Sequence, residues 1–385
     1  MIERALRGSK RYWGWVGVLI VLSAIGTLAY LVQRFSGTEN TGLSRDVSWG
    51  LFIANYTFFV GVAASAVMVV LPYYVHDYKE FGRIAVFGEF LAVAAIAIAG
   101  LFIFVDVGQP LRSFNLLLHP TPGSPLFWNT IILPVYMGLN VLIAWAALGA
   151  EDKSIPPPWW IKPLIYISIP WAISIHTVTA FVYAGLPGRA FWNTAILAPR
   201  FLVSAFASGP ALLIVMCIMI KRLTGFDPGK KALGQLAVIV AYSMILNLFF
   251  IVLEFFSSFY SSIPSHTQGL EYLFFGLQGH GKLVPWIWSS VAFAVVGTVL
   301  LVVPVVRRND TILAAACIIV FFSLWIDKGL CLVVAGFIPS PMATITEYAP
   351  SLFEVIITIG VWAVGFLMLS VLYKIALSVR KEAIQ

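Results

Sequence analysis

The chain has 385 residues, of which 60% are hydrophobic and 11% are charged, and its formal net charge at pH 7 is +7. A water-soluble domain carries about 25% charged residues, so the composition excludes a soluble protein and indicates one that crosses a membrane several times. The positive charge does not call for a nucleic-acid partner, because basic residues concentrate at the cytoplasmic ends of membrane helices.

Ten apolar stretches are long enough to cross the hydrocarbon core of a bilayer, which takes about 20 helical residues. They predict an all-α, polytopic membrane protein with one integral membrane domain over residues 1–385. In chain order, the predicted spans are residues 14–33, 49–75, 84–106, 127–149, 164–184, 200–220, 235–260, 286–306, 311–337 and 352–376.

The lysines and arginines divide unequally between the two sides of these spans, with 17 on one side, 6 on the other and Lys328 inside the ninth span. Cytoplasmic connections carry the excess of basic residues, so both termini are predicted to be cytoplasmic. The 17 residues are Arg4, Arg7, Lys10, Arg11, Lys79, Arg83, Lys153, Lys162, Lys221, Arg222, Lys230, Lys231, Arg307, Arg308, Lys374, Arg380 and Lys381; the 6 are Arg34, Arg45, Arg112, Arg189, Arg200 and Lys282.

Two similar stretches open the second and sixth spans, 143 residues apart: Phe58–Ala66 and Phe201–Gly209. Both are rich in small residues, which let membrane helices pack closely. The repeat favours two four-helix bundles, at residues 49–184 and 200–337, flanked by the first and tenth spans.

The longest outer connections are residues 107–126 and 261–285. The second combines glycines with large apolar residues and is predicted to be a loop that lies at the interface or under a partner. Tryptophans near span ends, such as Trp49 and Trp192, are predicted to be interface anchors.

Metal and haem ligands are scarce in the sequence. The three cysteines, Cys217, Cys317 and Cys331, lie in separate spans without a CxxC pair, so no iron–sulfur cluster or structural metal is expected in this chain. Of the five histidines, only His176 lies well inside a span. A bis-histidine haem needs two, so no haem is expected.

Several ionisable residues fall in or beside the outer half of the spans. A charge in hydrocarbon costs about 2.5–3.5 kcal/mol on insertion scales, so such residues are rare and often functional. Their common depth indicates a site that exchanges protons. They are Asp106, Arg112, His176, Arg200, Glu254, Asp327, Lys328 and Glu354.

Two segments contain the first candidates. Asp106 closes the third span, Pro110 stops the helix and Arg112 follows; a salt bridge between Asp106 and Arg112 that locks the turn is the alternative to a functional role. The fifth span contains His176, and a histidine side chain, which ordinarily titrates near neutral pH, can relay a proton to or from a bound redox molecule. A packing role is the alternative for this lone imidazole.

Further candidates lie at the outer ends of other spans. Asn55 and Tyr56 lie a turn or two below the surface in the second span, where they can donate hydrogen bonds to a ring carbonyl. Arg200 heads the sixth span, and snorkelling to lipid headgroups is its alternative role.

The remaining buried charges suggest a proton path or structural ion pairs. Glu89 lies near the cytoplasmic side of the third span, where Asn140 is a possible companion. Glu254 in the seventh span is a candidate partner for Lys328 in the ninth, and Asp327 points about 100° away from Lys328 if the helix is regular.

Taken together, the helix end Asp106–Arg112, the segment Ser174–Thr179 and the stretch Gly188–Gly209 resemble the NrfD family of quinone-interacting membrane subunits, also called the polysulfide-reductase membrane-subunit family. The resemblance covers the second to ninth spans. The ten-span length and the segment 198–200 are similar to the NrfD-type subunits of membrane complexes associated with dissimilatory sulfite reduction.

This resemblance implies a menaquinone-linked subunit of an anaerobic respiratory oxidoreductase in a prokaryotic cell membrane, not active alone. It implies two four-helix bundles, an exchangeable menaquinone near the outer face, and electron exchange with an outer ferredoxin-like iron–sulfur subunit, alongside other membrane and cytochrome subunits. Carried over to this chain, Asp106, Arg112 and His176 are quinone-site or proton-handling residues, with Tyr56 and Arg200 as further candidates.

Two other functions stay open at this point. A secondary transporter would show broken helices at mid-membrane, often in inverted repeats, whereas the repeat found here is parallel and the polar groups lie off-centre. A cofactor-free anchor for redox subunits would need no buried acids. A quinone-linked proton pump is a variant of the main hypothesis.

Overall fold

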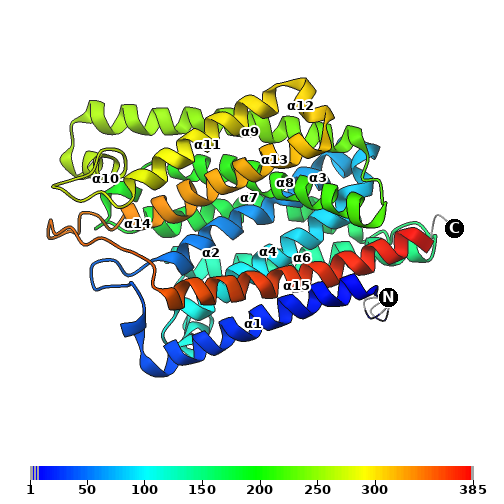
Figure 1. The fold of residues 1–385 in the computed structure, drawn as a ribbon, viewed down its shortest axis with the longest axis horizontal. Helices are drawn as coiled ribbons and strands as arrows, with labels where there is room; N and C mark the ends of the chain where they lie inside the picture. The colour runs from blue at the N-terminus through cyan, green and yellow to red at the C-terminus, as the bar shows by residue number, and fades with distance from the viewer. Residues whose placement is uncertain (1–2, 4–5, 7, 383–385) are drawn as a thin grey trace.

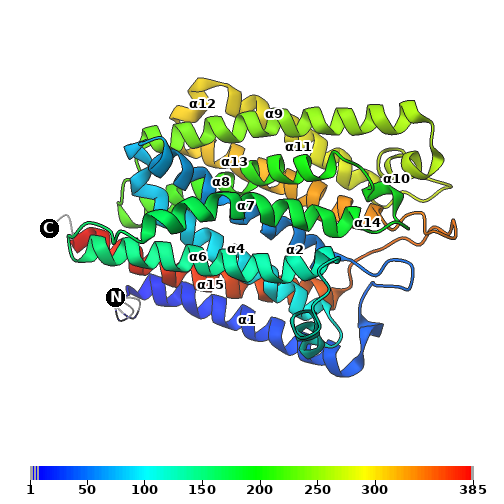
Figure 2. The same cartoon turned by 180° about the vertical axis from the view of Figure 1, so that it is seen from behind.

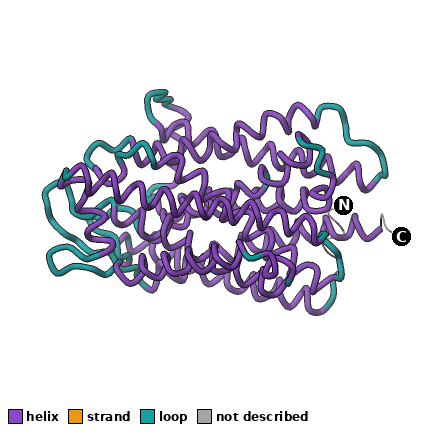
Figure 3. Tube along the Cα trace, turned by 90° about the horizontal axis from the view of Figure 1, so that it is seen from above, coloured by secondary structure: helices purple, strands orange, loops and turns teal. Residues whose placement is uncertain are grey.

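A computed structural model describes residues 3, 6 and 8–382 of the chain, and Arg4 and Arg7 of the basic residues counted above lie outside this part. The described residues form an elongated bundle of roughly parallel and antiparallel helices, with the connections gathered at its two ends (Figure 1, Figure 3). Both termini lie at one end, as an even number of spans requires (Figure 1). The opposite end is called the distal end below.

All ten predicted spans are present as helices long and apolar enough to cross a membrane, and helix is the only regular secondary structure in residues 8–382. Helices satisfy every backbone polar group internally, which hydrocarbon demands. The spans are α1 (Lys10–Ser36), α2 (Leu51–Val62) continued by η3 (Ala63–Ser65), α3 (Val67–Val70) and η4 (Leu71–Val75), α4 (Gly82–Asp106), α6 (Pro125–Asp152), α7 (Ile161–Ala184), α8 (Leu197–Thr224), α9 (Lys230–Ser261), α11 (Val284–Val302), α13 (Asp310–Leu324) continued by η8 (Trp325–Cys331) and α14 (Leu332–Ala335), and α15 (Leu352–Glu382).

Short helices lie between the spans. They are η2 (Thr38–Asn40), η5 (Lys79–Phe81), η6 (Pro110–Phe114), α5 (Asn115–Leu118), η7 (Ala190–Trp192), α10 (Pro264–Phe274) and α12 (Pro304–Arg308).

The spans pack with their sequence neighbours. In the first half, α2, α4, α6 and α7 contact one another in turn; in the second half, α8, α9, α11 and α13 do the same, and α8 also packs on α13. Helices α1 and α15 pair with each other and flank the first half through α4 (Figure 1, Figure 2). Helices α2 and α7 also contact α8, so the division into bundles at 49–184 and 200–337 stays a prediction.

The two similar stretches found in the sequence pack directly against each other. A Cβ atom on Gly209 of α8 would lie 2.6 Å from the backbone nitrogen of Ser65, and one on Gly61 of α2 would lie 3.7 Å from the Cα of Ala205. Small residues therefore allow a close crossing between the two halves, the arrangement that such stripes favour in membrane helices.

Two sequence expectations about helix geometry need correction. The eighth span ends at Val302, earlier than predicted, because Val303 precedes Pro304 and is extended, with φ −72° and ψ 117°. The connection 261–285 is partly helical, since α10 buries Leu270, Tyr272 and Leu273 against the second half. This helix has eleven residues, which is too short to cross a membrane, so it was not predicted as a span.

Candidate functional site

A large hollow lies in the distal half of the described chain, between α2, α4, α6 and α15, and its volume is about 750 Å³. Most of its wall is apolar, contributed by residues such as Ile53, Leu101 and Leu133. Phe104 and Leu126 in this wall are 48% and 43% exposed, so the cavity opens on the lateral surface, where lipid would lie. Its size falls within the about 300–1,000 Å³ typical of small-molecule sites.

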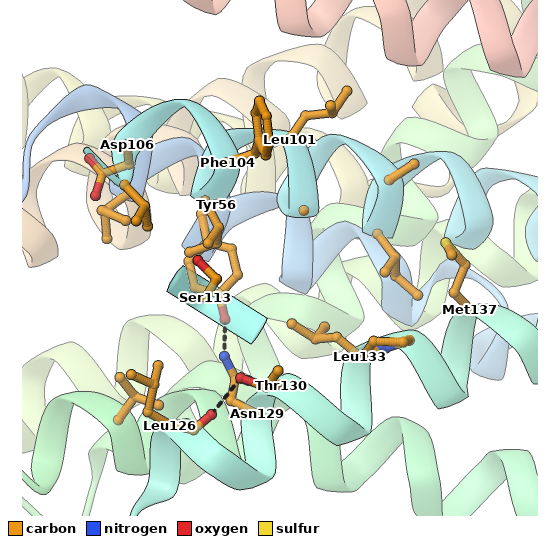
Figure 4. Close-up of a pocket in the computed structure, with 18 of the residues that line it drawn as sticks. Tyr56, Leu101, Phe104, Asp106, Ser113, Leu126, Asn129, Thr130, Leu133 and Met137 are labelled. Carbon is orange, nitrogen blue, oxygen red and sulfur yellow. Dashed lines mark hydrogen bonds between the residues drawn. The ribbon is translucent and has the colours of Figure 1, made fainter. Parts of the chain in front are cut away.

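A chain of polar side chains borders one side of this cavity. The Asn129 amide of α6 hydrogen-bonds the Tyr56 hydroxyl of α2 (Figure 4). The Thr179 hydroxyl of α7 lies 3.1 Å from Asn129 Oδ1. Tyr183 also lines the cavity, and its hydroxyl shares a hydrogen bond with Thr57. The sequence identified Tyr56 as a candidate but not Asn129, Thr179 or Tyr183. These side chains form a polar chain only where α2, α6 and α7 meet.

Asp106 lines the same cavity at the last residue of α4 (Figure 4). Its Oδ1 atom is buried and has no hydrogen-bond partner in the described chain. The predicted salt bridge with Arg112 is not formed, because η6 starts a new helix axis at Pro110 and carries the exposed Arg112 away from the cavity. Asp106 is thus a carboxylate facing an apolar hollow without a fixed partner.

Asn55 and Trp192, in contrast, have structural roles. The Asn55 Oδ1 atom accepts hydrogen bonds of 3.0 Å from the indoles of Trp325 and Trp362, and its Nδ2 donates to the Leu51 carbonyl at 2.8 Å. Trp192 is fully buried and donates to the Leu332 carbonyl at 2.9 Å. The expectation that Trp192 is an interface anchor is therefore wrong.

A second buried polar group lies in the other half of the molecule. Arg200 of α8 forms ion pairs with Glu254 of α9 and with Asp327 of η8, the latter at 2.6 Å. The Asp327 Oδ2 atom is buried and has no hydrogen-bond partner among the described residues. Arg200 therefore does not snorkel to headgroups, and the suggested pairing of Glu254 with Lys328 is wrong.

Lys328 has a different environment from the ion pairs. Its ammonium donates to the Phe201 carbonyl at 3.1 Å and lies 4.5 Å from the centre of the Phe201 ring. Asp327 and Lys328 both belong to the π-helical segment η8, a distortion that often accompanies functional sites. A Cβ on Gly61 would lie 3.0 Å from the Lys328 Nζ, so this glycine leaves room for the ammonium at the junction of the two halves.

His176 and Glu89 are buried away from the cavity. Neither ring nitrogen of His176 has a hydrogen-bond partner in residues 8–382, and the same holds for both carboxylate oxygens of Glu89. His176 lies within electrostatic reach of Lys328, and it precedes Thr179 by one helical turn. The structure therefore places His176 behind the polar chain and not on the cavity wall.

A smaller cavity of about 180 Å³ approaches the ion pairs from the distal end. Glu254, Ser257, Ser258 and Ser261 of α9 line it, together with His266 of α10. Positions three, four and seven residues apart share one face of a helix, so these hydroxyls form a polar stripe that ends at Glu254. The sequence contains this spacing, but only the position of α10 shows that the stripe borders a cavity.

The connections at the distal end are tied together by Glu347. It accepts hydrogen bonds from the Lys282 backbone N–H at 2.8 Å and the Tyr272 hydroxyl at 3.1 Å. Burial opposes ionisation of Glu347, but these bonds and that of His280 outweigh it and lower its pKa. This carboxylate holds the segment before α15 against α10 and the loop that follows it.

Comparison with known proteins identifies the class of this chain. Residues 39–339 match the family described as polysulphide reductase, NrfD. The chain therefore belongs to the NrfD family, and it is a multi-pass membrane protein.

Individual relatives extend over almost the whole chain. A provisionally named dimethyl sulfoxide reductase membrane subunit of Halobacterium salinarum is 27% identical, with 92% of this chain and 89% of the relative covered. The Hdr-like menaquinol oxidoreductase integral membrane subunit of Archaeoglobus fulgidus is 24% identical over 98% and 96%. The menaquinone reductase integral membrane subunit of Nitratidesulfovibrio vulgaris is 21% identical over 95% and 91%.

Proposed function

We propose that this chain is the quinone-reactive membrane subunit of a multi-subunit respiratory oxidoreductase. It would exchange electrons between menaquinol and an iron–sulfur subunit docked at the distal end, in a prokaryotic cell membrane with the termini cytoplasmic. Two of the relatives described above carry menaquinol or menaquinone in their names, which supports this class of substrate. Placement in a sulfite-reduction complex remains a prediction from the resemblance.

The observation that carries the proposal is the composition of the large cavity. Its lateral opening and apolar wall suit a ligand that arrives from the lipid phase, and a few polar groups converge at its distal side. A buried carboxylate oxygen without a partner, on Asp106, is the group that an incoming hydroxyl would satisfy. When bound, menaquinol supplies two electrons and two protons on oxidation.

The position of each residue at the cavity indicates its role in quinone binding or proton transfer. Asp106 would hold or accept a proton at its free oxygen, and the Tyr56–Asn129 pair would orient a ring oxygen. The chain through Thr179 leads toward the helix that carries His176, which would then act as an interior relay. Arg112 lies outside the cavity wall, so we assign it to the distal surface and not to the ring.

Asp106→Asn tests this assignment. The change keeps the shape of the side chain and removes its ability to take up a proton, and loss of a general base typically costs 10²–10⁴-fold in rate. We expect kcat/KM for menaquinol oxidation by the intact complex to fall by about that factor. Asp77→Asn is the control, because this exposed residue at the terminal end has a φ of 50°, which Asn also adopts.

The result that would contradict the site is unchanged turnover in Asp106→Asn. Loss of turnover in Asp77→Asn as well would point to a general effect on assembly.

A second candidate function is proton transfer through the other half of the molecule. The serine-lined cavity connects the distal end to Glu254, and beyond it lie Arg200, Asp327 and Lys328. Together these groups would form the distal part of a proton route. The buried Glu89 near the terminal end would form a separate part of it.

A further inference from the structure

A second hollow lies beside the large cavity, on the side that faces α1. It occupies about 230 Å³ between α1, α4 and α15. Leu101, Phe104 and Val364 line both hollows. The two spaces are therefore neighbours that share a wall, and the Phe104 side chain in that wall is about half exposed.

Small residues open this second hollow, called the α1 groove below. Ser23, Gly26 and Thr27 lie along one face of α1, and Gly360 lies opposite on α15. A Cβ on Gly360 would lie 2.5 Å from the Cα of Gly26, so the two helices cross at a distance that only glycines allow.

The α1 groove is apolar although hydroxyl residues line it. The Ser23 hydroxyl donates to the Leu19 carbonyl at 2.7 Å, and the Thr27 hydroxyl donates to the Ser23 carbonyl at 2.8 Å. Both donors are used within α1 and leave no demand for a polar ligand. The remaining wall consists of residues such as Tyr30, Ile357 and Val361. Such a surface suits a flexible hydrocarbon chain.

We propose that the α1 groove holds the polyprenyl tail of the menaquinone whose ring occupies the large cavity. This inference rests on the proposed function. The polar groups that would face the ring lie at Tyr56 and Asn129, whereas Leu101 and Phe104 lie on the side of the cavity away from Asn129 (Figure 4). Leu101 and Phe104 line both spaces, so a tail that leaves the ring along these two residues would reach the groove.

A lipid acyl chain is the other hydrocarbon that fits the α1 groove. A lipid would occupy it independently of the ring site. The tail is attached to the ring, so burial of its apolar surface in the groove would add to the affinity of the quinone for the cavity. The dependence of quinone affinity on the tail separates the two occupants.

The experiment compares two ligands on the purified full-length chain, menaquinone with a short polyprenyl tail and the tail-less ring menadione. Binding is read from quenching of tryptophan fluorescence, for which Trp49 in the cavity wall is a natural reporter. Ser23→Phe and Thr27→Phe each fill the groove. Leu28→Phe is the matched control, because Leu28 is 63% exposed on the same helix and lies outside the groove.

We expect either groove variant to bind the tailed quinone about tenfold more weakly and to bind menadione as the wild type does. Leu28→Phe should bind both ligands normally. Unchanged affinity for the tailed quinone in both groove variants would overturn the proposal and leave the groove to lipid. An equal loss of affinity for the tailed quinone and for menadione would overturn it as well. If the wild-type chain binds neither ligand while it is folded, the quinone site itself is wrong, and the tail groove falls with it.

Discussion

Arg200 shows how the structure pairs buried charges. One guanidinium serves two carboxylates, Glu254 and Asp327, and Asp327 keeps a buried oxygen without a partner. Removing one member of a buried ion pair typically costs about 3–5 kcal/mol, so the three residues depend on one another. The group has two carboxylates and one guanidinium, so the charge of one carboxylate is not neutralised within it. A site that takes up a proton requires such a carboxylate.

Glu254→Gln tests whether this group conducts protons. The amide can still accept a hydrogen bond from Arg200, but it cannot be protonated at the end of the serine-lined cavity. In proteoliposomes that contain the complex, we expect proton release per menaquinol oxidised to fall at least about twofold, while oxidation continues when the membrane is made leaky to protons. Glu39→Gln is the control, because Glu39 is an exposed residue of η2. Normal proton release in Glu254→Gln would remove Glu254 from the route.

At the scale of single residues, the sequence named most of the groups that could carry chemistry, since a charge inside an apolar span stands out. It did not predict their partners. Arg200 and Asp327 lie 127 positions apart in the chain, and the spacing of residues along separate helices does not encode which faces meet.

At the scale of helices, the crossing of α2 with α8 depends on glycine. A Cβ atom on Gly209 would lie within 2.7 Å of backbone atoms of Ser65 and Val62. Backbone atoms cannot rotate away as a side chain can, so added volume must separate the two helices.

Gly209→Ala should therefore destabilise the protein, although alanine favours helix by about 1 kcal/mol over glycine. Overpacking of this kind costs about 1–3 kcal/mol, and we expect a net fall in the midpoint of thermal unfolding. Gly234→Ala is the control, because a Cβ at that position in α9 meets nothing within 4 Å; it should leave the midpoint unchanged or raise it. Equal midpoints for both variants would show that the α2–α8 crossing is looser than described.

The helix distortions belong to this scale as well. The ninth span contains no proline, and Asp327 and Lys328 are its only charged residues, yet η8 takes a π-helical course there. The widened turn lets Asp327 reach Arg200 while Lys328 reaches the Phe201 carbonyl. Both bonds form across helix pairs, so the distortion follows from tertiary contacts and not from local preference.

At the scale of the whole molecule, the placement of both termini at one end agrees with ten spans (Figure 1). The excess of basic residues predicts that this end faces the cytoplasm. The large cavity, the serine-lined cavity and α10 would then all open toward the outer side of the membrane, where a redox partner could dock.

This orientation can be tested by labelling single cysteines in intact cells. The native cysteines are buried and give little background. Thr121→Cys is exposed at the distal end, and Lys153→Cys is exposed at the terminal end. A maleimide that cannot cross the membrane should label Thr121→Cys and leave Lys153→Cys unlabelled until the cells are opened. The reverse pattern would invert the predicted topology.

The ten spans, their order and the sidedness of their charges followed from the sequence, because hydrocarbon admits only long apolar helices and membranes sort basic residues by side. The sequence also identified Asp106 and Tyr56, because they are polar residues within predicted apolar spans. The cavity they border, the chain through Asn129 and Thr179, the ion pairs of Arg200 and the α1 groove all arise where helices distant in sequence touch. Such contacts depend on how each helix rotates and crosses its neighbours, and in a uniformly apolar span the hydrophobic pattern does not specify that rotation.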